Sequence, residues 1–543
     1  MIAARLRRSV VHAIAGCSAL AVLATAGCTA VPGARDAGGS TTATPAPSGS
    51  PTATPPPIPP STPITPITRN GAGVPLAPTS YYRQKLTWRD CGAASEPFEC
   101  STLRVPRDYR SPAPSIRLAV LRRSAEDRGA RIGSLVVNPG GPGASGVEYA
   151  RYASQSFSAD VLRRYDIVGF DPRGVGSSSP PVRCLDDSRT DEWLSMDVSP
   201  DTPAEIRRLT RFDASFARSC QRHTGAVLGH VSTVEAAADL DVLRAALGET
   251  TLTYFGASYG TLLGATYAQE FPARVGRMVL DGAVSPTVTV EQAAKAQAVG
   301  FDQALDALLA DCVTRTSCPV GSTVPTARTA VVRLLARLDR HPLPTATNRP
   351  LTQQLAENGI AEALYSRSQW PVLLLALQAA RRGYGAGLLM LADNYSQRVD
   401  GSYQSLLLQA NVAINCLDSG PTGQTPPELL AQEPAYREAA PVFGVTLLWS
   451  SVQCDDWPVR APYPTPTITA AGAAPIVVVG TTRDPATPYA WSRELAGALE
   501  SGVLVTRDGD GHTGYHRGSS CVDTAVDTYL VQGRPPADGT RCS

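Results

Sequence analysis

The sequence predicts an α/β fold in which a mostly parallel, doubly wound sheet is interrupted by an inserted helical cap. Two observations predict it. Short apolar runs alternate with helical patterns up to about residue 285, and the same alternation resumes over residues 466–543. The stretch between them, 286–465, shows helical patterns without a buried-strand run. Strands that alternate with helices are typical of parallel sheets, because parallel neighbours need a crossover connection.

The first part of the sheet is predicted from apolar runs bounded by turn residues. Helical spacing of apolar residues, with Thr233 as an N-cap in one case, predicts the helices between the runs. The expected strands are 116–121, 134–137, 165–170, 252–255 and 277–280, and the expected helices are 203–220, 233–247 and 261–270.

One domain with a single sheet is expected to consist of two segments, 81–285 and 466–543, which lie on either side of the middle of the chain. The expected cap helices are 290–312, 327–338 and 371–382, followed by strand 475–479, helix 488–499 and strand 503–505. A cap inserted between two halves of one sheet is therefore expected at 286–465.

Residues 1–28 are predicted to be a lipoprotein signal peptide. Three arginines among the first eight residues precede the apolar stretch Val10–Ala26, which is too short and too soon interrupted to cross a membrane comfortably. The stretch ends at Thr25–Cys28 (TAGC), which resembles a bacterial lipobox, so acylation of Cys28 is expected. Cys17, which ends a second lipobox-like stretch, is less favoured as the acylated residue, because the apolar region of the signal peptide before it would be only a few residues long. The alternative is ordinary signal-peptidase cleavage near Ala30.

Residues 29–80 are rich in Thr, Pro, Ser, Ala and Gly, with almost no large apolar side chains. Such a segment cannot bury enough surface to offset the entropy of ordering it. We therefore expect a disordered tether between a lipid anchor in the membrane and the folded domain, which places the protein at the extracytoplasmic face of the membrane (the cell envelope) or in secreted form.

Charge and cysteine content restrict the partners. The net charge of +1 gives no reason to expect nucleic acid as a partner. Of 12 cysteines, Cys17 and Cys28 belong to the leader, and the rest contain no CxxC pair. The chain has only six histidines, and its cysteines and histidines do not occur at the spacing of zinc ligands. Neither a metal nor a cofactor is therefore expected. Disulfides are expected instead. Their connectivity is open, with nearest-neighbour pairing, such as Cys91–Cys100 and Cys312–Cys318, the simplest arrangement.

The pentapeptide Gly256–Gly260 (GASYG) carries the main functional signal. It follows an apolar strand and precedes a helix, which is the setting of a nucleophile elbow. Glycines at both flanks allow the tight turn, where side chains would clash between strand and helix. Ser258 is therefore the predicted nucleophile, and an ordinary hydroxyl in a glycine-rich loop is the alternative.

A serine hydroxyl needs a base, and the predicted order along the chain is serine, acid, histidine. His223 and His230 precede Ser258, and His341 lies at a helix end in the expected cap. His512 lies in a glycine-rich loop directly after strand 503–505, which can bring the imidazole over the sheet edge. His512 is therefore the predicted base, and His516 is expected to be a loop residue.

Asp484 is the predicted acid because it follows strand 475–479 and precedes His512. Asp508 and Asp510 are rivals that share the histidine loop and are expected to shape that turn. Thr487 is expected to cap the following helix, with Pro488 at the first position, and its hydroxyl is a second candidate support for the triad.

The segment Asn138–Gly143 (NPGGPG) is the predicted oxyanion loop, because its glycines let backbone N–H groups approach a substrate oxygen. Pro139 and Pro142 have no N–H, which makes Gly141 the natural donor. The second expected donor is the N–H of Tyr259, the residue after the nucleophile.

Five motifs in this order resemble the secreted tripeptidyl-aminopeptidase-like serine hydrolases of actinobacteria. This family is related to proline iminopeptidases and includes mycobacterial envelope proteins also described as carboxylesterases. The motifs are Asn138–Gly143, Gly169–Ser177 (GFDPRGVGS), Gly256–Gly260, Asp484–Pro488 (DPATP) and Gly509–Gly514 (GDGHTG), with Ala413–Asp418 (AINCLD) and Cys454–Pro458 (CDDWP) near the end of the cap. The resemblance implies an α/β-hydrolase fold and acyl transfer. Pro139 stands where iminopeptidases have His.

The expected function is an aminopeptidase that releases short peptides from free N-termini. A substrate ammonium needs an acidic partner, and Asp418, Asp455 and Asp456 in the cap are the candidates, each with surface solvation as the alternative. A carboxylesterase would use the same triad without an ammonium site. A non-catalytic surface-binding lipoprotein is the third hypothesis, and an intact nucleophile, base, acid and oxyanion loop argue against it.

Overall fold

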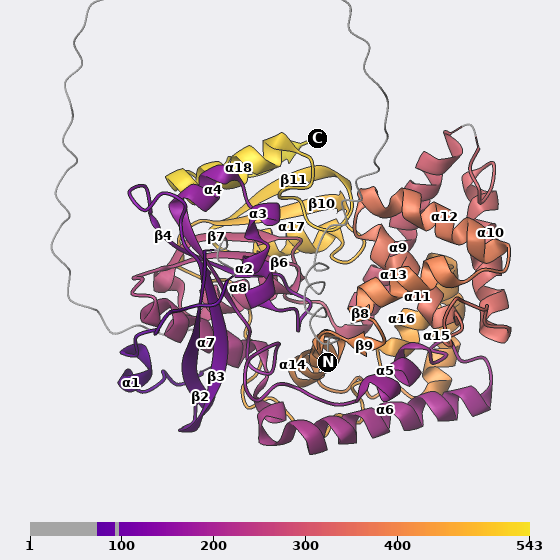
Figure 1. The fold of residues 1–543 in the computed structure, drawn as a ribbon, viewed down its shortest axis with the longest axis horizontal. Coiled ribbons are helices and arrows are strands. Elements are labelled where there is room, and N and C mark those ends of the chain that lie inside the picture. The colour runs from indigo at the N-terminus through magenta and orange to yellow at the C-terminus, as the bar shows by residue number, and fades with distance from the viewer. Residues whose placement is uncertain (1–72, 93–96, 316) are drawn as a thin grey trace, which may run out of the picture. The chain divides into compact units, whose positions relative to one another are not determined.

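The computed structural model describes residues 73–92, 97–315 and 317–543. The expected signal peptide, Cys28 and the expected tether up to residue 72 lie outside the described residues. The described residues form a sheet of ten strands in the order β1-β2-β3-β5-β4-β6-β7-β10-β11-β12 (Figure 1). The strands are β1 (Arg89–Asp90), β2 (Phe98–Asp108), β3 (Ser111–Arg123), β4 (Gly133–Asn138), β5 (Tyr165–Phe170), β6 (Leu252–Ala257), β7 (Val275–Asp281), β10 (Ile476–Arg483), β11 (Gly502–Asp510) and β12 (Thr540–Cys542).

The kind of strand pairing changes once across this sheet, at β5. β1, β2, β3 and β5 are antiparallel neighbours, whereas all strands from β5 to β12 run parallel. Every residue of β4 and β5 is buried, as expected for parallel strands that are covered on both faces. The carboxyl ends of β4, β6, β7, β10 and β11 consequently meet at one edge of the sheet.

Alternation along the strands divides the core into two layers. Val136, Tyr254 and Val478 face a cluster that includes α7 (Thr233–Ala246) and α8 (Tyr259–Glu270). Their neighbours in sequence, such as Val137, Phe255 and Val479, face the opposite cluster. That second cluster is covered by α2 (Gly146–Arg151), α3 (Ala153–Ser156), α4 (Ala159–Arg164) and α18 (Ser520–Gln532). The elements expected from apolar runs are therefore those that carry the core.

Helices occupy most of the chain between β7 and β10, together with a short hairpin, β8 (Arg398–Val399) and β9 (Ser402–Tyr403). The helices are α9 (Val290–Val313), α10 (Val324–Arg340), α11 (Gln353–Leu364), α12 (Trp370–Arg381), α13 (Ala386–Ser396), α14 (Leu407–Ser419), α15 (Pro426–Ala439) and α16 (Gly444–Ser450). Helices α9 to α13 form a core of their own. Residues of α14 such as Ala410 and Ala413 instead join the core beside the sheet.

Three further helices complete the described elements outside the cap: α5 (Asp187–Leu194), α6 (Pro203–Thr224) and α17 (Tyr489–Ala498). A short helix, α1 (Thr79–Tyr82), begins inside the expected tether. Val74 and Ala77 are already buried there, at 1% and 5% exposure. The expected tether boundary at residue 80 is therefore too late, because two small apolar side chains can dock on an existing core without forming a regular element.

The ten cysteines among the described residues form five disulfides. The pairs are Cys91–Cys100, Cys184–Cys220, Cys312–Cys318, Cys416–Cys454 and Cys521–Cys542. Nearest-neighbour pairing is thereby confirmed. Within the described residues, no helix has the length and apolar character needed to cross a membrane.

Candidate active site

Ser258 occupies the sharp turn between β6 and α8. Its φ of 56° lies in the left-handed region, a conformation that costs free energy for a residue other than glycine and is found at functional sites. The flanking glycines are required by space, because a Cβ at Gly256 would lie 2.3 Å from the Gly260 carbonyl oxygen. The Ser258 N–H donates to the Asp281 carbonyl oxygen at 2.8 Å. The turn is thus held at the carboxyl edge of the sheet.

The oxyanion loop lies directly against this turn. A Cβ at Gly140 would lie 2.8 Å from Ser258 Cβ and 2.9 Å from the Tyr259 nitrogen. The Gly140 N–H donates to Asn138 Oδ1 at 2.9 Å, whereas the Gly141 N–H takes part in no hydrogen bond among the described residues. Tyr259 is the first residue of α8, so its N–H has no acceptor within the helix. Both expected donors are therefore available beside Ser258.

His512 and Asp484 face each other across the loops that follow β11 and β10. His512 Nδ1 lies 2.9 Å from each Asp484 carboxylate oxygen. Asp484 is 3% exposed, and its oxygens also accept the backbone N–H groups of Ala486, Thr487 and Thr513. With Nδ1 bound to the carboxylate, Nε2 is the imidazole nitrogen left to take a proton.

Of the two roles expected for Thr487, the structure contradicts the helix cap and agrees with a hydroxyl placed beside the predicted base. Helix α17 begins at Tyr489, with Pro488 as the N-cap and no side-chain cap. The Thr487 hydroxyl instead lies 3.3 Å from His512 Nδ1. The expected cap is wrong, because Pro488 already starts the helix and leaves the threonine in the acid loop, where it contacts the imidazole.

Two residues at the end of β7 bring the serine and the histidine to one place. The Asp281 carbonyl binds the Ser258 N–H, and a Cβ at the next residue, Gly282, would lie 3.3 Å from His512 Cε1. Gly282 has a φ of 68°, which a side chain would also disfavour. Ser258, His512 and Asp484 are therefore gathered at one sheet edge from three different strand ends.

The Asp281 side chain was not singled out from the sequence. Its carboxylate accepts the N–H groups of Gly514 and Tyr515, at 2.7 and 2.9 Å, and so holds the loop that carries His512. Burial raises the pKa of this carboxyl to about 6. An aspartate at the end of an apolar strand was the available signal, the same one that identified Asp484.

The cap contacts the loops of this site. A Cβ at Gly300 of α9 would lie 2.7 Å from the Pro485 carbonyl oxygen in the acid loop. The His512 N–H donates to the Tyr365 carbonyl oxygen at 2.9 Å, and Asn411 of α14 donates to the Pro142 carbonyl oxygen at 3.1 Å. The space above the serine is thus bordered by helices of the insertion.

Comparison with known proteins shows which family the chain resembles. The TAP-like protein family matches residues 440–542. The chain is 38% identical over 482 residues to the serine protease Hip1 of Mycobacterium tuberculosis, covering 84% of this chain and 91% of that protein. Carboxylesterase B of the same organism is 36% identical over 452 residues, 82% of this chain and 86% of its own. The tripeptidyl aminopeptidase of Streptomyces lividans is 31% identical over 505 residues, which cover 88% of this chain and 90% of that protein.

The chain belongs to the TAP-like family of α/β hydrolases. It is a serine hydrolase of the aminopeptidase or esterase type, because its relatives are named for those activities. The expected resemblance and the expected fold class are confirmed.

In this TAP-like hydrolase, two of the three expected ammonium partners are committed elsewhere. Asp418 accepts the N–H and the hydroxyl of Thr233, at 2.9 and 2.5 Å, and burial raises its pKa to about 7. Asp455 accepts the Thr422 N–H at 2.7 Å. Asp456 is exposed. These positions fix a helix start and a loop, roles that follow from tertiary neighbours the sequence does not reveal.

A different carboxyl group lies close to the triad. Glu362 of α11 has no hydrogen bond or ion pair for its carboxylate among the described residues, and burial raises its pKa to about 7. Its charge contributes to the raised pKa values of Tyr365 and Tyr395. The Tyr365 ring meets the His512 ring edge-on, with centroids 5.3 Å apart. Glu362 is therefore one aromatic residue away from the base, and no motif in the sequence marks it.

One group of potential metal ligands occurs in the described part of the chain. Asp108, His230 and Glu235 offer ligand atoms within 4.8 Å of one another. Glu235 is fully buried and already lies 3.3 Å from the Arg173 guanidinium. The arginine provides the positive charge that a metal ion would otherwise bring, so the geometry favours an ion pair there.

Proposed function

We propose that this TAP-like hydrolase is an exported aminopeptidase that cleaves through an acyl-enzyme on Ser258. His512 Nε2 takes the Ser258 proton while Oγ attacks the scissile carbonyl carbon. The oxyanion accepts hydrogen bonds from the N–H groups of Gly141 and Tyr259. His512 then protonates the leaving amine, and a water molecule activated by the same histidine releases the acyl group. Asp484 stays ionised and holds the imidazole in the required tautomer.

The observation that carries the choice of an aminopeptidase is Glu362. Glu362 is partly buried; a carboxylate that is largely removed from water without a partner is costly, and a substrate ammonium would give it one. Glu362 lies in the cap beside Tyr365, which itself binds the His512 backbone. We therefore assign Glu362, in place of Asp418, Asp455 or Asp456, as the partner of the substrate N-terminus. The enclosing helices limit how much chain can extend past that ammonium.

The test compares matched peptides with free and acetylated N-termini in the wild type and in Glu362→Gln. The wild type should cleave the free peptides far better, and the variant should lose this preference through a higher KM. Small neutral esters should react equally in both enzymes, because the triad is intact. Equal cleavage of acetylated and free peptides by the wild type would contradict the aminopeptidase and favour the carboxylesterase.

Glu357 provides a matched control on the same helix. It is 2% exposed, and burial raises its pKa to about 7 as well. Its carboxylate, however, is bound by Thr446 and Gln353, at 2.6 and 2.8 Å. Glu357→Gln removes a carboxylate that is even more deeply buried than Glu362 but is already partnered, so the preference for free N-termini should persist in this variant.

Export and anchoring at Cys28 are part of the proposal. The leader pattern supports them, and so do five disulfides, which form and persist outside the cytoplasm. Fractionation of cells that produce the wild type should recover the enzyme with the membrane, labelled by a palmitate analogue.

A further inference from the structure

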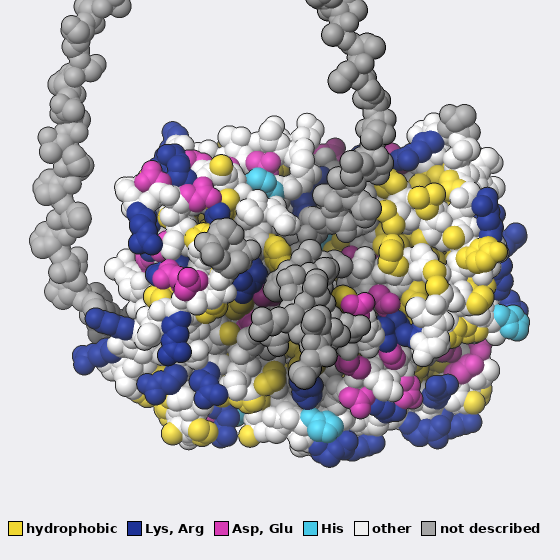
Figure 2. Space-filling model, viewed as in Figure 1, with side chains coloured by type: hydrophobic (Ala, Val, Ile, Leu, Met, Phe, Trp, Pro, Cys, Tyr) yellow, Lys and Arg dark blue, Asp and Glu magenta, His cyan; other side chains and the backbone are white. Residues whose placement is uncertain are grey.

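Helix α6 carries a row of arginines on its outer face. Leu209, Phe212 and Phe216 turn inward and are buried, whereas the arginines are exposed. The row, called here the α6 arginine row, consists of Arg207, Arg211, Arg218 and Arg222. At 3.6 residues per turn these positions fall within about 60° of one another and extend over about 22 Å of helix. Figure 2 shows arginine and lysine side chains in dark blue along the lower edge of the molecule, where Figure 1 places α6.

The α6 arginine row is not balanced by local acids. Ala204, Ala214, Ser215 and Gln221 lie on this face between the arginines, and none is acidic. Within the described part of the chain, none of the four arginines takes part in an ion pair. Arg207 with Arg211 and Arg218 with Arg222 are like-charged pairs at i,i+4, a spacing that destabilises a helix slightly. The row therefore does not serve the stability of the helix.

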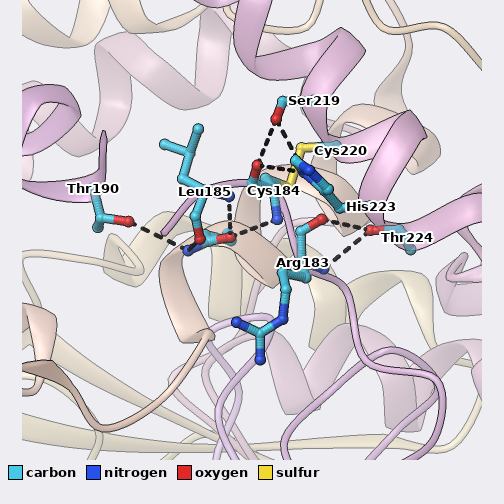
Figure 3. Close-up of a disulfide and its surroundings, with 9 residues drawn as sticks. Arg183, Cys184, Leu185, Thr190, Ser219, Cys220, His223 and Thr224 are labelled. Carbon is cyan, nitrogen blue, oxygen red and sulfur yellow. Dashed lines mark hydrogen bonds between the residues drawn. A yellow bond between two sulfur atoms is a disulfide. The ribbon is translucent and has the colours of Figure 1, made fainter. Parts of the chain in front are cut away.

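The C-terminal half of α6 is fixed to the rest of the molecule, so the row has a defined position. Figure 3 shows the Cys184–Cys220 disulfide that ties the helix to the segment just before α5. Beside it, the Ser219 hydroxyl donates to the Cys184 carbonyl oxygen at 2.6 Å, and the Thr224 hydroxyl donates to the Arg183 carbonyl oxygen at 2.9 Å.

A hollow of about 370 Å³ adjoins the end of the row. It is lined by Arg218 and Arg222 together with Arg189 and His223, and Asp186 is the acid in its lining. An anionic group that approaches this end of the helix would therefore meet mostly cationic side chains.

We propose that the α6 arginine row is a docking surface for a membrane that contains anionic lipids. Four charges spread over about 22 Å cannot all touch one small anion, but they match an extended sheet of phosphate headgroups. A lipid anchor and a tether, as expected at residues 1–80, would keep the enzyme near the bilayer without fixing its orientation. The row would supply the orientation. Each arginine near the surface strengthens partitioning onto the anionic membrane by about fivefold.

The test uses the mature chain, residues 29–543, which differs from the proposed exported protein only by the acylated cysteine. Flotation measures binding to phosphatidylcholine vesicles with and without phosphatidylglycerol. The wild type should bind only the anionic vesicles, less so as salt is added. Replacement of all four arginines of the row by glutamine should weaken binding at least about tenfold.

The matched control removes four exposed arginines that lie on other elements and form no ion pair in the described structure: Arg128, Arg333, Arg340 and Arg382. This variant has the same net charge as the row variant and should bind the anionic vesicles within about twofold of the wild type. Ester hydrolysis in all three proteins checks folding, and vesicle binding does not depend on turnover. Equal loss in both variants, or binding of polyphosphate without binding of anionic vesicles, would overturn the proposal.

Discussion

The most informative perturbation of the cap is Glu362→Gln, because its effects on stability and on catalysis have opposite signs. Burial raises the pKa of Glu362 from 4.5 to about 7. A shift of about 2.5 units corresponds to about 3 kcal/mol at about 1.36 kcal/mol per unit. In the folded protein the proton is held more tightly than in the unfolded chain. The charge therefore costs nothing at pH 4, and its cost grows between about pH 4.5 and 7 and is fully present above pH 7.

The glutamine variant should consequently be as stable as the wild type at pH 4 and more stable at pH 8, by up to about 3 kcal/mol. Urea unfolding at the two pH values measures this difference. The Glu357→Gln control should not gain in this way, because it also gives up a carboxylate that accepts two hydrogen bonds.

The catalytic effect of the same substitution is a loss. Without the carboxylate, the KM for peptides with free N-termini should rise by about tenfold or more, since an unpaired ammonium would be buried. The kcat for a neutral ester should stay within about twofold. A variant that gains stability at pH 8 but keeps its preference for free N-termini would show that Glu362 is buried near the site without meeting the substrate, and the assignment would be wrong.

Two other predictions concern the histidine loop and the anchor. Asp281→Asn should lower kcat by about tenfold or more with a smaller change in KM. The Gly514 and Tyr515 N–H groups bind different oxygens of the carboxylate, and an amide replaces one of those oxygens by an NH2 group that cannot accept. Steady-state kinetics on an ester decides this, and normal turnover would mean that the loop is positioned by other contacts. Cys28→Ala should release the enzyme from the membrane and abolish labelling by a palmitate analogue; a wild type that is itself soluble and unlabelled would exclude acylation.

The sheet and the meeting of Ser258, His512 and Asp484 at one edge of it were predictable because their signals are local. Apolar runs of four to six residues, glycines at fixed offsets and the order of motifs along the chain need no knowledge of tertiary contacts. The strands at the antiparallel edge were less visible. β2 contains Pro106 and β3 contains Pro112 and Pro114, residues that weaken a strand pattern but are tolerated near a sheet edge.

The residues that were missed depend on neighbours distant in sequence. Glu362 resembles an ordinary polar residue of an amphipathic helix, and only the packing of α11 beside the His512 loop buries it. Asp418 could not be recognised as the partner of Thr233, because the two residues are 185 positions apart. The α6 arginine row, by contrast, was within reach of the sequence, since helix 203–220 was predicted and the arginines recur at helical spacing.

Identification of the acylated residue tests the central claim most directly. The wild type, Ser258→Ala, His512→Ala and His516→Ala are treated with a fluorophosphonate probe, and the labelled peptide is identified by mass spectrometry. The account predicts a single label on Ser258, no label in Ser258→Ala, strongly reduced labelling in His512→Ala and normal labelling in His516→Ala. A folded Ser258→Ala variant that is still labelled, or a His512→Ala variant that reacts normally while His516→Ala does not, would contradict the proposed triad.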